Sequence, residues 1–157
     1  MQGPPLNDLF ERVSFAPCAS TDFEELLNIR ILAMRESLER LGRFCVDRAR
    51  QRLERSFYPA HTEFILLDGK RIGFHTFRPA QDGFHLEHFY IHPTEQSNGI
   101  GSHVLGMLTG RADRACMPIF LGALRESPAN RFYERRGFVR NSESEWDIYY
   151  IRSPRTR

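Results

Sequence analysis

The sequence predicts an α/β fold in which a mixed, mostly antiparallel sheet of about six to seven strands is combined with about four helices. Apolar residues follow helical spacing over residues 23–41 and again from about residue 101 to 114. Elsewhere they alternate with polar residues or form short apolar runs, as β-strands do. The length of 157 residues suits a single domain spanning residues 1–157.

The first third of the chain reads as one strand and two helices. "RVSFAPC" is typical of a short strand, and Ser20, Thr21 or Asp22 can cap the helix that follows. The apolar stripe of that helix is Phe23, Leu26, Leu27, Met34, Leu38 and Leu41. Gly42 is placed to end it. "VDRARQRLERSF" predicts a second, shorter helix that stops before Pro59.

The pattern then changes to strands. "TEFILLDGKRIGFHTFRP" predicts a hairpin with Asp68-Gly69 at the turn, and "DGFHLEHFYIHP" predicts another strand. A helix is expected from about Gly101 to Arg114, followed by a buried strand in "MPIFLGAL".

The last part predicts one helix and two strands. "SPANRFYERRG" reads as a helix that Ser127 caps, with Pro128 at its first position and Gly137 at its end. "FVR" and "EWDIYYIR" are expected to pair as antiparallel strands.

Composition excludes several classes of protein. No apolar run is long enough for a membrane span, and the first residues lack the pattern of a signal peptide, so we expect a cytoplasmic protein with no membrane partner. The net charge of +2 argues against a nucleic-acid partner. Cys18, Cys45 and Cys116 have no metal-ligand spacing, which predicts reduced thiols and no metal.

The stretch "QSNGIG" before the third predicted helix is the clearest functional signal. A helix N-terminus has unpaired N–H groups and a partial positive charge, and glycines let the backbone approach a ligand closely. Together these features form a site for a diphosphate. The stretch is not a Walker loop because no Lys-Ser/Thr follows Gly101, and it lacks the third glycine of a dinucleotide fingerprint.

Three segments together resemble the GNAT superfamily of acetyl-CoA-dependent N-acetyltransferases. They are the strand "HLEHFYIHP", the "Q-x-x-G-I-G" loop and the later "ANRFYERRGF". The resemblance covers the whole chain in the order of its elements and is specific in the loop and in the helix that carries Phe132-Tyr133 and ends at Gly137-Phe138. Ser127 stands where members often have an Asn.

The resemblance implies a GNAT-like fold and acetyl-CoA as the co-substrate. In this family the cofactor lies where the fourth strand separates from the fifth. The implied cofactor-binding residues are Phe89, Tyr90, Ile91 and His92 on the strand, Gln96, Ser97, Asn98, Gly99, Ile100, Gly101 and Ser102 in the loop, and Ser127, Asn130 and Tyr133 on the later helix.

The same resemblance suggests catalytic roles. Tyr133 is expected near the cofactor sulfur, where its phenol can protonate the leaving thiolate, although an aromatic on a helix is also a common core residue. Glu87 and His85 share one face of their strand, so either can take the proton of the amine, directly or through water. A half-solvated strand explains Glu87 equally well and His85 better. His88 and His92 are interpreted as structural.

The expected reaction is acetyl transfer to a primary amine by direct attack in a ternary complex. Cys45 and Cys116 lie outside both motifs, so a covalent intermediate is not expected. Arg30 and Trp146 are candidates for binding the acceptor, a small molecule or peptide whose identity stays open. A homodimer is a family expectation. The alternative from another class is a non-catalytic acyl-CoA-binding or sensing module, which retention of Tyr133 and Glu87 disfavours.

Overall fold

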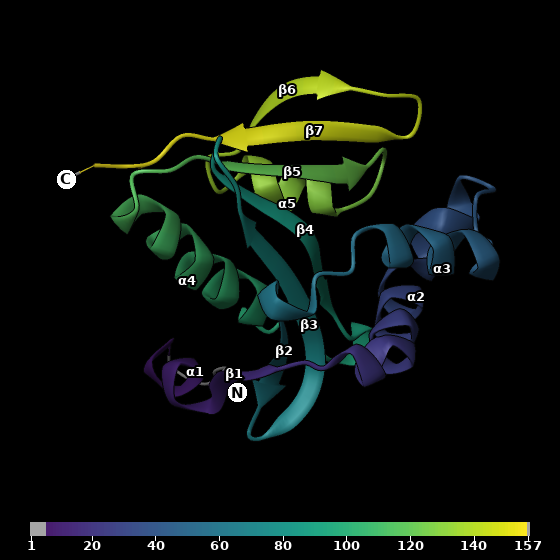
Figure 1. Ribbon diagram of the computed structural model, residues 1–157, viewed down its shortest axis with the longest axis horizontal. Helices are drawn as coiled ribbons and strands as arrows, with labels where there is room; N and C mark the ends of the chain where they lie inside the picture. Colours follow the sequence, from purple (N-terminus) through teal and green to yellow (C-terminus); the bar gives the residue numbers. More distant parts are fainter. Residues whose placement is uncertain (1–5, 157) are drawn as a thin grey trace. The chain divides into compact units, whose positions relative to one another are not determined.

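The computed structural model describes residues 6–156, and within them the chain forms five α-helices and seven strands (Figure 1). The helices are α1 (Leu6–Arg12), α2 (Phe23–Arg40), α3 (Val46–Arg55), α4 (Ile100–Arg114) and α5 (Ala129–Glu134). The strands are β1 (Val13–Pro17), β2 (Thr62–Leu67), β3 (Lys70–Pro79), β4 (Phe84–Ile91), β5 (Ile119–Leu124), β6 (Val139–Glu143) and β7 (Asp147–Arg152). Short 3₁₀ turns lie at Ser20–Asp22, Pro59–His61 and Pro93–Glu95.

The strands follow the order β1-β2-β3-β4-β5-β7-β6 in one sheet. β4 and β5 pair in parallel over Phe84–Leu86 and Ile119–Leu121. β1 with β2, β2 with β3, β5 with β7, and β6 with β7 are antiparallel. The predicted fold class, a mixed and mostly antiparallel sheet with helices, is therefore confirmed.

The chain divides into two compact units. The first unit comprises the residues up to Thr76 together with His88–Met107, and the second comprises Phe77–Glu87 and the residues from Leu108 onward. β3, β4 and α4 contribute residues to both units. The expectation of a single domain stays a prediction, and each unit is described separately below.

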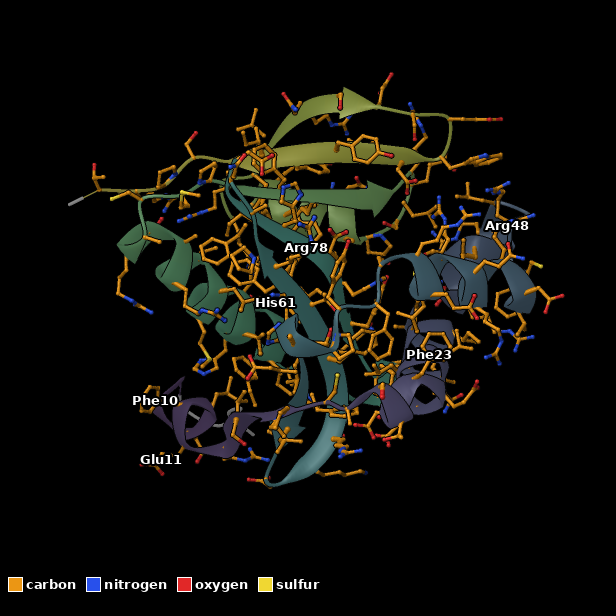
Figure 2. The ribbon with its side chains drawn as sticks, viewed as in Figure 1. Phe10, Glu11, Phe23, Arg48, His61 and Arg78 are labelled. Carbon is orange, nitrogen blue, oxygen red and sulfur yellow. The ribbon has the colours of Figure 1, made fainter. Side chains whose placement is uncertain are left out.

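The core of the first unit lies where α2 and α3 meet the side chains of β2 and β3. The apolar face of α2 contributes Leu26, Leu27 and Ile29, and α3 contributes Ala49 and Leu53. These pack with Phe64 and Phe74, neither of which has any solvent exposure. Phe23, labelled in Figure 2, packs on this cluster and stacks on Phe57. This packing fixes α2 and α3 over β3 and the end of β4.

The C-terminal end of α2 follows the predicted signal, whereas no side chain caps its N-terminal end. Asp22 is the N-cap residue, but its carboxylate accepts from the N–H of Ala19 rather than from the helix. At the other end, Gly42 has φ 67° and donates to the carbonyl of Glu39, while Arg43 donates to that of Leu38. This pair of bonds is a Schellman motif, which glycine favours at the left-handed position.

Sequence periodicity failed to predict α1. The helix has only seven residues, so a repeat of 3.6 residues is scarcely visible in it. It is held by tertiary contacts instead: Leu9 is buried, and Arg12 pairs with Asp8 within the helix and with Asp68 in the β2–β3 turn. Phe10, labelled in Figure 2, is 77% exposed.

The second unit is built around β5. β5 pairs with β7 along its length, β7 pairs with β6, and α5 packs on β5 (Figure 1). Arg152 at the end of β7 is buried and donates to both carboxylate oxygens of Asp113, at 2.9 and 3.1 Å. One prediction here is wrong: the N-cap residue of α5 is Pro128, not Ser127, and no side chain caps the helix.

Candidate functional site

The loop between β4 and α4 is held by a side chain and by two left-handed residues. Gln96 donates from Nε2 to the carbonyl oxygen of Ile91 at 2.8 Å, which ties the loop to the last residue of β4. Ser97 has φ 71° and Gly99 has φ 80°. Only glycine adopts such angles without a steric penalty, so Gly99 is a conformational requirement of the loop.

The loop leads directly into the N-terminus of α4. The helical hydrogen bonds begin with the N–H of His103 and the carbonyl of Gly99, at 3.1 Å. An α-helix leaves the N–H groups of its first turn without partners inside the helix, and its dipole places partial positive charge there. The first turn of α4 contains no acidic residue that would neutralise this charge. The backbone is therefore suited to an anion such as a diphosphate.

The strand segment before this loop is packed closely against β3. A Cβ atom added to Gly73 would lie 2.2 Å from the carbonyl oxygen of Tyr90, so only glycine fits there. The N–H of His92 donates to Ile72 at 2.7 Å. The imidazole of His92 accepts from the N–H of Thr94 as the cap of the following 3₁₀ turn. The His92 imidazole therefore stabilises this turn, and its interpretation as a structural residue stays a prediction.

Arg30, in the first unit, packs against Tyr90 of the strand segment Phe89 to His92. Its side chain is buried on α2, and its guanidinium carbon lies 5.9 Å from the centre of the Tyr90 ring. His88 is also buried and contacts Ser56 and the hydroxyl of Tyr90. Burial, with the charge of Arg30 as a second cause, lowers the pKa of His88 to about 3. Sequence reasoning named Arg30 but missed this polar cluster, which only the packing of α2 and α3 on β4 brings together.

In the second unit, Tyr133 lies on α5 and is 8% exposed. Its ring contacts those of Phe132, Phe138 and Tyr150. Both interpretations of Tyr133 therefore remain open in the geometry, because a ring buried among aromatics can still present its hydroxyl to a ligand.

Asn130 links α5 to the end of β5 and to Tyr150 of β7. Its Nδ2 donates to the carbonyl of Leu124 at 2.8 Å and to Ser127, while its Oδ1 accepts from the hydroxyl of Tyr150 at 2.8 Å. Tyr150 also contacts Glu134, and its pKa is raised, first by burial and then by the hydrogen bond to that carboxylate. A hydrogen bond from the Asn130 Nδ2 to the cofactor would have to replace one of these bonds, whereas Oδ1 can accept a second one.

The two predicted base residues, also in the second unit, each have a charged partner. Glu87 accepts from Arg78, labelled on β3 in Figure 2, at 2.9 Å. His85 contacts the carboxylate of Asp82 at 2.9 Å and stacks on Phe120. The hydrogen bond to His85 is the first cause that lowers the pKa of Asp82. Trp146, proposed for acceptor binding, is half-buried, and its carbonyl accepts from the N–H of Arg125.

The predicted residues thus fall into two groups. Arg30 and the segment from Phe89 to Ser102 belong to the first unit, whereas His85, Glu87, Ser127, Asn130, Tyr133 and Trp146 belong to the second. Cys18, Cys45 and Cys116 are free thiols. In the part of the chain that the structure describes, no group of His, Cys, Asp and Glu side chains is arranged to hold a metal ion. Within residues 6–156, no helix combines the length and apolar character that a bilayer crossing requires.

Comparison with known proteins identifies the family. The family model of the acetyltransferase (GNAT) domain matches residues 56–140, which is more than half of the chain. This match includes β4, the glycine-containing loop, α4 and α5. A search of curated protein sequences found no significant match. The chain belongs to the GNAT acetyltransferase family, as the sequence motifs suggested, and acetyl transfer is the chemistry that this membership supports.

Solved structures share the fold at low sequence identity. The chain is similar to the PaiA N-acetyltransferase of Thermoplasma acidophilum in complex with coenzyme A, with a TM-score of 0.72 and 13% identity over 90% of this chain and 98% of that one. An acetyltransferase of Thermus thermophilus gives a TM-score of 0.70 with 15% identity, covering 90% and 97%. The ribosomal-protein-S18-alanine N-acetyltransferase of Escherichia coli gives 0.68 with 15%, covering 92% and 96%.

Proposed function

We propose that the protein is an acetyl-CoA-dependent N-acetyltransferase that acts on a primary amine by direct attack in a ternary complex. The observation that carries the proposal is the N-terminus of α4, which has no acidic residue in its first turn and follows a loop that Gln96 and Gly99 shape. Family membership and a similar structure that contains coenzyme A support the same assignment. A cytoplasmic location stays a prediction.

The diphosphate of the cofactor is assigned to the backbone from Gln96 to Ser102. The residues fit this group because the helix dipole attracts an anion and the positive φ angles of Ser97 and Gly99 turn the chain into α4. The strand segment Phe89 to His92 is assigned to the pantetheine and acetyl part. When bound, acetyl-CoA supplies an activated acyl group on a thioester.

Tyr133 and the base candidates are assigned to proton transfers. The phenol of Tyr133 donates a proton to the departing thiolate. Glu87 or His85 removes the proton of the amine, directly or through water, because an alkylammonium ion has no lone pair for attack. We assign acceptor contacts to Arg30 and Trp146. We assign cofactor contacts to Ser127, which precedes α5, and to Asn130 on α5.

A panel of amines with acetyl-CoA tests the proposal, with release of the CoA thiol as the measurement. We expect thiol release to depend on at least one amine in the panel. A protein that binds CoA but releases no thiol with any amine would instead be a non-catalytic acyl-CoA-binding module.

A substitution in the loop tests the cofactor assignment separately. CoA should raise the Tm of the protein, since a ligand that binds only the folded state stabilises it. Gly101→Glu should abolish this shift, because the new carboxylate competes for the helix dipole and repels the diphosphate. An acidic residue in the first turn suits a helix, so the variant should still fold. Gly106→Glu, at an exposed position of α4 with open space around it, is the matched control and should keep the shift.

A further inference from the structure

Arg30 is a buried cation with few internal partners. Its side chain lies on α2 with an exposed fraction of 4%. Nη1 donates to the carbonyl of Ala49 at the long distance of 3.4 Å, and Nε is buried without any hydrogen-bond partner. Among residues 6–156, no carboxylate forms an ion pair with Arg30. A buried guanidinium in such an environment is unfavourable unless something else supplies an acceptor.

The charge of the other buried arginine is compensated within the chain, although its Nε, like that of Arg30, has no hydrogen-bond partner. Arg152 is 5% exposed, almost the same as Arg30, yet it forms two hydrogen bonds with Asp113 at 2.9 and 3.1 Å. Two arginines outside α2 pair with glutamates of the same helix: Arg71 contacts Glu25 at 2.9 Å, and Arg50 pairs with Glu24. The carboxylates of Glu24 and Glu25 on α2 thus bind arginines at the surface and not Arg30.

The polar neighbours of Arg30 do not provide a negative charge. The Ser56 hydroxyl has one hydrogen, which it donates to the carbonyl of Arg52 at 2.9 Å. Its contact with His88 Nε2 at 2.7 Å must then be accepted from an Nε2–H. The Nδ1 atom of His88 accordingly accepts from the hydroxyl of Tyr90 at 3.2 Å. This chain of hydrogen bonds fixes one neutral tautomer of His88 and leaves the charge of Arg30 uncompensated.

We propose that Arg30 binds the carboxylate of the acceptor, so that the preferred substrate is an amine that also carries a carboxylate, such as an amino acid or a short peptide. The inference rests on the proposed function, which assigns the segment Phe89 to His92 to the acyl end of the cofactor. Tyr90 lies within that segment and packs against Arg30. Tyr90 and Ser56, which border the cluster, are only partly buried, whereas Phe74, which packs on the Tyr90 ring, is completely buried.

Matched amines with and without a carboxylate test the substrate class. Alanine is compared with alaninamide, and the dipeptide Ala-Ala with its amide, by kcat/KM from CoA-thiol release. We expect the carboxylate to raise kcat/KM by about 10- to 100-fold, the range for hydrogen bonds with charged groups. A larger ratio of kcat/KM for alanine over alaninamide would indicate a free amino acid as the substrate. A larger ratio for Ala-Ala over its amide would indicate a peptide. Equal rates for both members of each pair would overturn the proposal.

Three variants separate this role from a structural one. Arg30→Met keeps an unbranched side chain and removes the charge, so it should abolish the preference for the amine that carries a carboxylate. Arg30→Lys should restore part of the preference. Arg50→Met is the matched control, because Arg50 pairs with Glu24 at the surface, and it should leave the preference unchanged. A preference that persists in Arg30→Met would overturn the assignment.

A binding measurement keeps this proposal distinct from the proposed function. N-acetylalanine should raise the Tm of the wild type but not that of Arg30→Met, while N-acetylalaninamide should shift neither. Retention of this difference without acetyl transfer to any amine would overturn the proposed activity alone. Acetyl transfer with no carboxylate dependence in either the rates or the Tm would overturn the carboxylate site alone.

Discussion

At the scale of single residues, the structure assigns specific partners to the side chains that the motifs pointed to. Asn130 is used for holding α5, Glu87 pairs with Arg78, and His85 with Asp82. A residue type in a motif therefore predicts which hydrogen bonds or proton transfers a side chain can make. Its contacts in the structure show which of its polar atoms already bind other residues of the chain.

Tyr133→Phe should keep CoA binding and lose turnover. The substitution removes only the hydroxyl, so the ring contacts with Phe138 and Tyr150 should remain. General-acid catalysis typically contributes about 10²–10⁴-fold, and we expect a loss in kcat within that range. The measurement is kcat under saturating acetyl-CoA, with the CoA-induced Tm shift as the control for binding. A loss smaller than about threefold with chemistry rate-limiting would show that another group or solvent protonates the sulfur.

Glu87→Gln should lower the rate at pH 7 and regain part of it at pH 9–10. An alkylamine has a pKa of about 10.4, so at neutral pH it is mostly protonated and needs a base to remove the proton before attack. At pH 9–10 more of the amine is already neutral, so the base is less necessary. The measurement is the ratio of variant to wild-type kcat/KM across this pH range. Glu143→Gln breaks a comparable pair with Arg125, at 3.1 Å, and should leave the ratio unchanged. A constant ratio for Glu87→Gln would reduce Glu87 to a binding charge.

At the scale of elements, the contact of β3 with β4 depends on a residue without a side chain. Gly73 lies against the carbonyl of Tyr90, next to the strand segment assigned to the cofactor. The sequence could not single out Gly73, because a glycine within a strand pattern also fits a bulge or a weak strand.

Gly73→Ala should destabilise the protein by about 1–3 kcal/mol, the usual effect of forcing extra atoms into a packed site. Its methyl group would lie 2.2 Å from a backbone oxygen, which cannot move without shifting the strand. Denaturant unfolding measures the change. At the exposed position Gly106 of α4, an added Cβ would meet no atom within 4 Å outside the local helix backbone, so Gly106→Ala should instead stabilise by about 0.4–1 kcal/mol. Equal effects of the two substitutions would contradict the close contact.

At the scale of the whole molecule, a buried histidine links stability to pH. The pKa of His88 is about 3 in the folded protein, because burial and then Arg30 disfavour its charged form, and about 6.5 when unfolded. Between these values the unfolded chain binds a proton that the folded state excludes. The full stability is therefore present above pH 6.5 and declines as the pH falls toward 3, by up to about 1.4 kcal/mol per unit.

Denaturant unfolding from pH 7 to pH 4.5 measures this slope. His88→Gln should flatten it, whereas His61→Gln, at an exposed position, should not. Asp82 and Asp113 also have pKa values lowered from the ordinary 3.8, so their contributions disappear mainly below that pH. An unchanged slope in His88→Gln would show that His88 is not the linked group.

The sequence by itself determined the elements that short-range chemistry encodes. The hairpin turn at Asp68-Gly69, the glycine end of α2, the loop before α4 and the family follow from local patterns and motifs, and the structure and the family comparison agree with them. Contacts between distant residues were decided only by the tertiary structure, because no local pattern encodes a partner far along the chain. Arg12 of α1 pairs with Asp68, the N-cap residue of α5 is Pro128, and the isolation of the charge of Arg30 results from packing α2, α3 and β4 together.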